Sequence, residues 1–289
     1  MVTQRSAESS VMRLRDGRSV CFAQYGDPEG IVVVNAHGGL SCHLDVASAG
    51  PAATTAGIRL ISPDRPGVGR SDPQPGRTIL DWAGDVGELM DHLGVDRFGV
   101  MGWSMGGQYA AAVGYALRSR VARVAIIAGA LPLTEPAVLA QLPTIDRSYT
   151  RLSKLAPPIA SLGFRVMGLA ARYGPTLTGR IAAHGLGPAD AVVLRREGFD
   201  AFSAMLGEGL RQPAGVVEEY RAWALPWGFA PQDLDVPVDV WAGTDDELIE
   251  PAWASELARR IPGATLHRRP GGHFVAHTCY PEIFEALRS

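Results

Sequence analysis

Five short, mostly apolar runs, each ending at or within two residues of a glycine or proline, constrain the fold of this chain more than any other feature. They are IVVVNA (31–36), IRLISPD (58–64), RFGVMGW (97–103), VARVAIIAG (121–129) and VPVDVWAG (236–243). Continuous apolar runs suit strands that are buried on both faces, as in a parallel sheet. Apolar residues at helical spacing follow two of them, over residues 78–93 and 104–117. This alternation predicts an α/β fold with a mostly parallel central sheet flanked by helices.

Residues 131–235 interrupt the alternation. They contain helical pieces separated by proline and glycine, without strand runs. The strand pattern resumes at residue 236, and ATLHRR (264–269) predicts the last strand, with helices over 251–260 and 281–287. Residues 10–26 predict a hairpin that turns at Asp16-Gly17. We therefore predict an α/β core formed by residues 1–130 and 236–289, with a helical cap inserted over residues 131–235.

Charge and composition exclude several classes of partner. The formal net charge of −3 predicts no electrostatic footprint for nucleic acid or an anionic membrane. No apolar run reaches the length of a membrane span, and the first 17 residues lack the apolar stretch of a signal peptide. The sequence therefore predicts a cytoplasmic protein. It leaves open whether that protein is a monomer or a homodimer.

The three cysteines, Cys21, Cys42 and Cys279, do not form a metal-binding pattern. Their number is odd and none belongs to a Cys-x-x-Cys motif, so free thiols in a reducing compartment are expected. Neither a metal nor a cofactor is predicted. The expected partner is a small-molecule substrate.

The stretch GWSMGG (102–107) places one serine between glycines, where a predicted strand becomes a predicted helix. A strained turn in this position projects the hydroxyl of Ser104 above the sheet edge, as in a nucleophile elbow. Bulky side chains at Gly102 and Gly106 would crowd such a turn. The alternative, a serine that only caps the helix, explains Ser104 but not both glycines.

A serine hydroxyl is a weak nucleophile and needs a base that is oriented by a third group. Carboxylates in WAGTDDELIEP (241–251) follow one predicted strand, and His273 in RPGGHFVAH (269–277) follows the last one. The chain order is therefore serine, acid, histidine. Because the carboxyl ends of parallel strands meet at one edge of the sheet, these distant residues are expected to converge there.

The chain resembles the α/β-hydrolase-fold serine hydrolases, in the capped group that includes esterases, proline iminopeptidases and carbon–carbon bond hydrolases. The resemblance covers nearly the whole chain. It is carried by NAHGG (35–39), SPDRPGVGRSD (62–72), GWSMGG (102–107), PVDVWAGTDDELIEP (237–251) and PGGHF (270–274). It implies the α/β-hydrolase fold and its catalytic machinery.

Carried over by position, the resemblance implies that Ser104 is the nucleophile, Asp246 the acid and His273 the general base. Asp246 is preferred to Asp245 because the family places the acid three residues after the glycine that ends the strand. Asp245 and Glu247 are expected to face solvent. His277 is a weaker candidate than His273, because it lacks the preceding glycine pair.

The family also implies an oxyanion hole made by the backbone amides of Gly39 and Met105. His37 is expected to organise the loop that contains Gly39 rather than to transfer protons. Leu40 stands where the family often has proline, which leaves the conformation of this loop less defined. Leu40, Trp103 and Phe274 lie beside the predicted catalytic loops and are the candidate substrate-binding residues. In the cap, the candidates are Met167, Met205, Trp223 and Trp227.

A serine nucleophile favours acyl chemistry. We predict a carboxylic-ester hydrolase for a small to medium, largely apolar acyl substrate, since residues 131–235 balance ten acidic against ten basic side chains. A carbon–carbon hydrolase would need a cation for a carboxylate, and Arg172, Arg195 and Arg196 are loose candidates. An aminopeptidase could use Glu218 and Glu219, although a solvated helix face is the favoured interpretation of that pair. A non-catalytic ligand-binding receptor on the same fold is a further possibility, from a different class of function.

Overall fold

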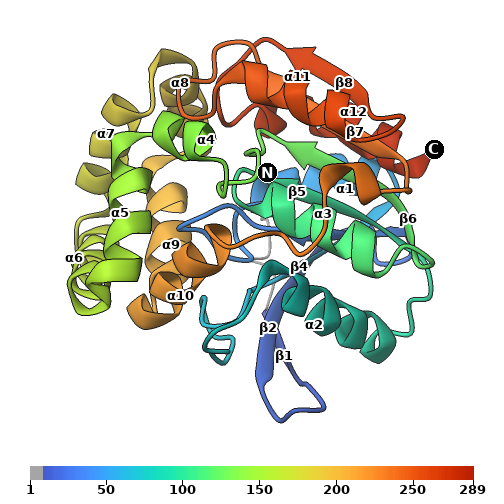
Figure 1. The fold of residues 1–289 in the computed structure, drawn as a ribbon, viewed down its shortest axis with the longest axis horizontal. Helices are drawn as coiled ribbons and strands as arrows, with labels where there is room; N and C mark the ends of the chain where they lie inside the picture. The colour runs from blue at the N-terminus through green and yellow to red at the C-terminus, as the bar shows by residue number, and fades with distance from the viewer. Residues whose placement is uncertain (1–8) are drawn as a thin grey trace.

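The computed structural model describes residues 9–289 and contains one eight-stranded sheet with the order β1-β2-β4-β3-β5-β6-β7-β8 (Figure 1). The strands are β1 (Ser10–Arg13), β2 (Ser19–Gly26), β3 (Ile31–Ala36), β4 (Ile58–Pro63), β5 (Phe98–Trp103), β6 (Val121–Ile127), β7 (Val238–Gly243) and β8 (Thr265–Arg269). The β1–β2 hairpin is antiparallel and β2 pairs antiparallel with β4, whereas every pair from β4 to β8 is parallel. The expected α/β fold with a mostly parallel sheet is confirmed.

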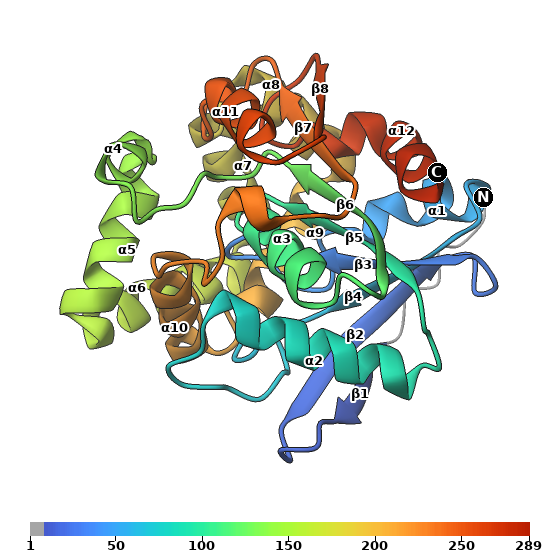
Figure 2. The ribbon, with the colours of Figure 1, turned by 45° about the vertical axis from the view of Figure 1, so that its right-hand side comes forward.

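Helices cover both faces of the sheet (Figure 2). Those outside the β6–β7 connection are α1 (Gly50–Thr55), α2 (Ile79–His92), α3 (Gly106–Ala116), α11 (Pro251–Arg260) and α12 (Ala276–Arg288). Alternate strand residues divide between the two layers: Val34 and Val100 pack with α2, α3 and α11, whereas Val33 and Met101 pack with α1 and α12. The central strands are thus buried on both faces, which explains their mostly apolar sequences.

Seven α-helices lie between β6 and β7 in the chain and pack beside the sheet, at the left of Figure 1. They are α4 (Pro136–Gln141), α5 (Thr144–Leu155), α6 (Pro157–Tyr173), α7 (Pro175–Gly185), α8 (Pro188–Glu197), α9 (Phe199–Gly209) and α10 (Pro213–Trp223). Five of them begin with proline, whose missing N–H and fixed φ suit the first position of a helix. The proline and glycine residues of this segment therefore mark helix boundaries, as the sequence indicates.

Two helix boundaries differ from the sequence-based expectation. Helix α3 begins at Gly106 rather than at Ser104, because Ser104 has a left-handed backbone with φ 55°. The last helix begins at Ala276 rather than at Pro281, and it bends at Cys279, which has non-helical dihedral angles. That bend lies two residues before Pro281, which cannot donate a helical hydrogen bond.

No helix within residues 9–289 is both long and apolar enough to cross a bilayer. The expectation that the chain lacks a signal peptide rests partly on residues 1–8, which lie outside the described residues.

Candidate active site

Three residues with left-handed backbones lie just beyond the carboxyl ends of neighbouring strands. Leu40 follows β3, Ser104 follows β5 and Ala128 follows β6, with φ values of 56°, 55° and 46°. A side chain in this conformation costs backbone energy and persists only where the surroundings impose it. Such strain concentrates at functional sites, and Ser104 is one of the three.

The turn that holds Ser104 leaves no space for side chains on either side. A Cβ atom placed on Gly102 would lie 2.1 Å from the carbonyl oxygen of Gly106, and one on Gly106 would lie 2.0 Å from the carbonyl oxygen of Ala36. The Ser104 amide donates to the Ile127 carbonyl oxygen at 2.8 Å, which ties the turn to strand β6. The two glycines are therefore required by backbone contacts, in agreement with the elbow interpretation.

His273 and Asp246 come together beside this turn. His273 Nδ1 and Asp246 Oδ2 are 3.0 Å apart, and both side chains are buried. The other oxygen of Asp246 accepts the amides of Leu248 and Ile249, each at 2.9 Å, which fixes the orientation of the carboxylate. Burial alone would lower the pKa of His273, but the charge and the hydrogen bond of Asp246 outweigh it, and the pKa is raised above its ordinary value.

The competing candidates for acid and base lie elsewhere. Asp245 and Glu247 are exposed, as expected. His277 lies in helix α12, where its Nδ1 atom is 3.2 Å from the Ser48 hydroxyl. Ser104 is half-buried, and its hydroxyl has no hydrogen-bond partner within residues 9–289. In particular, it makes no hydrogen bond with His273, whose Nδ1 faces Asp246. Catalytic hydrogen bonds are often long or poorly aligned before substrate binds, so the absence of this bond is compatible with a nucleophile at Ser104 and a base at His273.

The Met105 side chain lies beside Gly39. A Cβ atom placed on Gly39 would be 3.0 Å from Cε and 3.5 Å from Cβ of Met105, so a side chain at position 39 would crowd Met105. Among the hydrogen bonds of residues 9–289, neither amide donates to a protein acceptor. Met105 is buried and Gly39 is half-buried, and unpaired amides shielded from water need a partner. They can therefore bind an anionic oxygen.

The loop that carries Gly39 is held by hydrogen bonds to the two preceding residues, His37 and Gly38. The Gly38 amide donates to Asp45 Oδ2 at 3.0 Å, and the Gly38 carbonyl oxygen accepts from Arg65 Nη2 at 2.9 Å. The carbonyl oxygen of His37 accepts from Arg65 Nη1 at 2.5 Å, and the Arg65 amide donates to His37 Nε2 at 3.2 Å. Burial lowers the pKa of His37 well below its ordinary value, so its ring is neutral. These contacts agree with an organising role for His37.

Arg65 is in turn neutralised by a carboxylate from the inserted helices. Glu219 of α10 accepts from Arg65 Nε at 2.6 Å and lies 3.6 Å from Arg77 Nη2, and all three side chains are at most 1% exposed. The favoured interpretation of Glu218 and Glu219 as a solvated helix face is therefore wrong for Glu219. Glu218 is half-buried and pairs with Arg221. Burial of Glu219 has a physical reason, since it neutralises the two buried guanidinium groups.

Asp190 is a further buried carboxylate at the site, and sequence reasoning missed it. Its two oxygens accept the amides of His273 and Phe274 at 2.9 and 2.8 Å, so an inserted helix, α8, holds the histidine loop. Burial raises the pKa of Asp190, and these hydrogen bonds oppose that effect. In the sequence Asp190 looks like an ordinary acidic residue in the first turn of a helix, so no local signal marks it.

An apolar pocket lies next to the proposed catalytic residues. Trp103 and Phe274, which adjoin Ser104 and His273 in sequence, both line it, and their rings are 4.9 Å apart. The other lining residues are Leu44, Asp45, Ala47, Ser48, Val193, Leu194, Glu197, Ala201, Phe202, Met205 and His277. Leu40, Met167, Trp223 and Trp227 do not line this pocket. Trp223 and Trp227 belong to the hydrophobic core, and Met167 and Leu40 pack against it.

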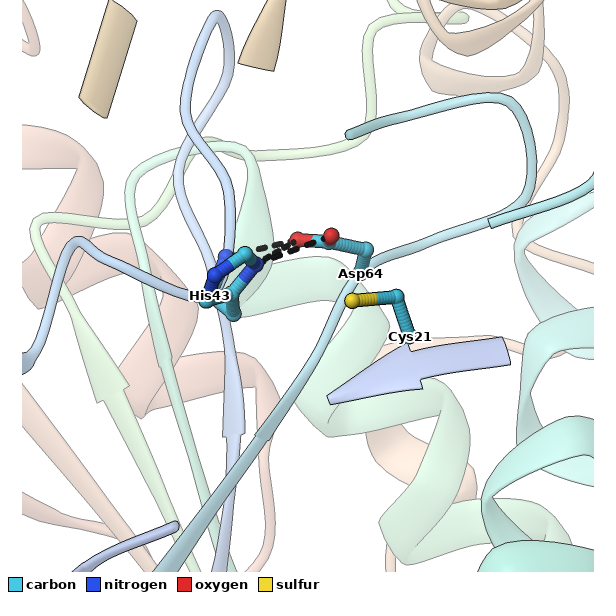
Figure 3. Close-up of side chains that lie close together, drawn as sticks. All are labelled: Cys21, His43 and Asp64. Carbon is cyan, nitrogen blue, oxygen red and sulfur yellow. Dashed lines mark hydrogen bonds and ion pairs between the residues drawn. The ribbon is translucent and has the colours of Figure 1, made fainter. Parts of the chain in front are cut away.

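Cys21, His43 and Asp64 form a cluster whose potential ligand atoms lie within 4.8 Å of one another (Figure 3). Its bonding indicates a structural role. His43 Nδ1 is 2.9 Å from Asp64 Oδ2, and the His43 amide donates to Asp64 Oδ1 at 2.7 Å. Burial raises the pKa of the Cys21 thiol to about 11, whereas a metal needs the thiolate. The cluster ties the segment after β3 to the turn after β4.

The sheet and its connections define the chain as a protein of the α/β-hydrolase class. The profile of the α/β hydrolase fold matches residues 31–278, so the chain belongs to this family. Sequence comparison finds the magnesium-chelatase 30 kDa subunit of Rhodobacter capsulatus, 31% identical over 227 residues, covering 76% of this chain and 73% of that protein. It also finds the 2-hydroxy-6-oxononadienedioate/2-hydroxy-6-oxononatrienedioate hydrolase of Cupriavidus pinatubonensis, 26% identical over 220 residues, covering 73% of this chain and 68% of that protein.

Structure comparison finds the same fold in the enol-lactonase of Burkholderia xenovorans. The TM-score is 0.69 with 21% identity, over 96% of this chain and 98% of that chain. This likeness supports the fold. The different activities named for these relatives leave the reaction of this chain to be argued from its own residues.

Proposed function

We propose that this protein is a serine hydrolase that cleaves carboxylic esters through an acyl-enzyme. The observation that carries the proposal is the meeting of three features at one sheet edge. These are Ser104 on a strained turn, the buried His273–Asp246 pair, and the two unpaired amides of Gly39 and Met105. Each supplies one requirement of acyl transfer: a nucleophile, an oriented base and donors for the oxyanion.

In the proposed mechanism, the Ser104 oxygen bonds to the ester carbonyl carbon while His273 Nε2 accepts the hydroxyl proton. The carbonyl oxygen becomes an oxyanion and accepts hydrogen bonds from the Gly39 and Met105 amides. Asp246 stabilises the charged imidazolium through Nδ1. Collapse of the oxyanion breaks the bond to the alcohol, which leaves with the proton from His273. A water molecule then repeats the sequence and releases the acid and Ser104.

The pocket supports a largely apolar substrate. Most of its lining residues are apolar, and among the described residues that line it there is no arginine or lysine. Its two carboxyl side chains are already engaged: burial raises the pKa of Asp45 to about 7 and its Oδ2 accepts from the Gly38 amide, and Glu197 pairs with Arg196. A substrate with a free carboxylate would find no arginine or lysine among these described lining residues to bind it. This favours a neutral ester or lactone over the dienoate of a carbon–carbon hydrolase.

Aminopeptidase activity and a purely ligand-binding role have less support. An aminopeptidase would need free carboxylates for an amine, but Glu219 is neutralised by Arg65 and Glu218 is paired with Arg221. A receptor without catalytic activity would need neither the aligned His273–Asp246 pair nor the unpaired amides.

A substrate panel tests the proposal. The purified protein is assayed with p-nitrophenyl acetate and butyrate, a lactone, a thioester and a dienoate-type diketone. We expect turnover of the neutral esters or the lactone, and none in Ser104→Ala. Preferential turnover of the diketone would assign carbon–carbon hydrolysis instead. Turnover retained by Ser104→Ala would overturn the proposed nucleophile.

A further inference from the structure

Helix α6 has an outer face that is both apolar and exposed. Ile159, Leu162, Val166, Leu169 and Tyr173 follow one another at spacings of three and four residues, so they form one stripe. Each is between 43% and 79% exposed. Leu177 and Ile181 of α7, both 65% exposed, continue the apolar surface. We call these seven residues the outer stripe. Contiguous exposed apolar surface of this kind marks an interaction site.

The outer stripe is not the face by which α6 packs on the protein. On the opposite side of this helix, Ala160, Phe164 and Ala171 are buried in the core. Phe164 stacks on Tyr149 of α5, with ring centroids 4.4 Å apart. Figure 1 places α5, α6 and α7 on the rim of the molecule away from the C-terminus. The outer stripe therefore lies on the side of α6 that faces away from the core, while the opposite side of the same helix provides its packing.

Helices α6 and α7, together with α5 before them, carry an unbalanced positive charge. Residues 147–189 contain six arginine or lysine residues and no aspartate or glutamate. The six are Arg147, Arg151, Lys154, Arg165, Arg172 and Arg180, and all are exposed. Among the residues that the structure describes, none of them makes an ion pair. Glu218 of α10 pairs with Arg221, which is not one of these six cations. The net charge of the whole chain is nevertheless −3, because the acidic residues outnumber the basic ones in the rest of the sequence.

We propose that the outer stripe and its six cations dock on the surface of an anionic lipid bilayer. An amphipathic helix with apolar side chains beside arginine and lysine lies in the membrane interface, with the apolar face at the acyl boundary and the cations at the headgroups. Arg165 and Arg172 border the apolar stripe on α6, as this arrangement requires. The net charge of −3, from which we expect no footprint for an anionic membrane, does not describe this local surface.

Other occupants fit these observations less well. A second copy of this chain, docked by the same face, would bring the six cations against six more without an acidic partner. A nucleic acid would satisfy the charges but would leave the outer stripe in water. An anionic bilayer satisfies both the charge and the apolar surface.

Vesicle flotation tests the proposal. We compare vesicles of phosphatidylcholine alone with an equimolar mixture of phosphatidylglycerol and phosphatidylcholine. The protein is expected to float with the mixed vesicles, and added salt should weaken this binding. Arg165→Gln with Arg172→Gln should weaken it about 30-fold, since each cation contributes about fivefold. Leu162→Asp with Val166→Asp should abolish it.

Matched variants on other parts of the surface serve as controls. Val11→Asp changes an exposed apolar residue of β1, and Arg288→Gln an exposed cation of α12, and both should bind as wild type does. Esterase activity and the thermal transition should be unchanged in all these variants, because the altered side chains are exposed. Absence of binding to mixed vesicles at low salt would overturn the proposal, as would equal binding by the α6 variants and the controls. A dimer that Leu162→Asp with Val166→Asp converts to a monomer, without vesicle binding by wild type, would assign the face to self-association instead.

Discussion

Replacement of Glu219 by glutamine tests the buried charge network behind the proposed oxyanion loop. Glutamine keeps the shape of the side chain and an oxygen that can accept from Arg65 Nε, so the change removes mainly the negative charge. Arg65 and Arg77 would then remain buried with their side chains fully inaccessible and without their neutralising partner. Breaking a buried pair in this way costs about 3–5 kcal/mol, a large part of the roughly 5–15 kcal/mol that stabilises a typical domain.

The neighbouring residue provides the control for Glu219→Gln. Glu218→Gln makes the same chemical change in a pair whose side chains are 22% and 37% exposed, for which the cost is about 0–1 kcal/mol. Urea and thermal unfolding followed by tryptophan fluorescence measure both variants. We expect the thermal midpoint of Glu219→Gln to fall by roughly 10 °C and that of Glu218→Gln to change little. Equal shifts in the two variants would refute the argument that Glu219 neutralises buried cations.

Three further predictions concern the proposed catalytic residues. Because the pKa of His273 is raised and the base must be neutral, kcat/KM should fall as pH decreases, with a midpoint above the ordinary imidazole value of about 6.5; a midpoint below that value would contradict the role of Asp246. Asp246→Asn should lower kcat by on the order of 10⁴ and also lower this midpoint, whereas Asp245→Asn should change neither; a reversed outcome would move the acid to Asp245. Asp190→Asn removes a charge that helps to raise the pKa of His273, so kcat/KM and its pH midpoint should both fall while Ser104 still reacts with a fluorophosphonate; an unchanged pH profile would reduce Asp190 to a purely structural contact.

The strands and the serine turn could be predicted from sequence because their signals are local. Mostly apolar runs indicate strands buried on both faces, and Gly102 follows from a contact with the Gly106 carbonyl oxygen four residues on, although the contact of Gly106 with the Ala36 carbonyl oxygen spans 70 positions. The juxtaposition of His273 and Asp246 followed from the topology of a parallel sheet, since both residues come after the carboxyl ends of strands. This part of the site needed no knowledge of side-chain packing.

The contacts made by the inserted helices could not be predicted in the same way. Glu219 meets Arg65 across 154 positions, and Asp190 meets the His273 amide across 83, so neither partner is visible in a local window. Helix α6 is apolar on two sides, and periodicity alone does not tell which side packs inward: Phe164 is buried and Leu162 is exposed. Likewise, residues 131–235 contain equal numbers of acidic and basic side chains, and this total does not reveal that six of the cations lie together in residues 147–189.

Covalent labelling of Ser104 tests the central claim most directly. The protein is incubated with a fluorophosphonate, and intact mass and peptide mass spectrometry then locate the adduct. We predict one label per chain, carried by Ser104, with loss of esterase activity in proportion to labelling and no label on Ser104→Ala. An unlabelled protein that still turns over esters, or a label on another residue, would contradict the account.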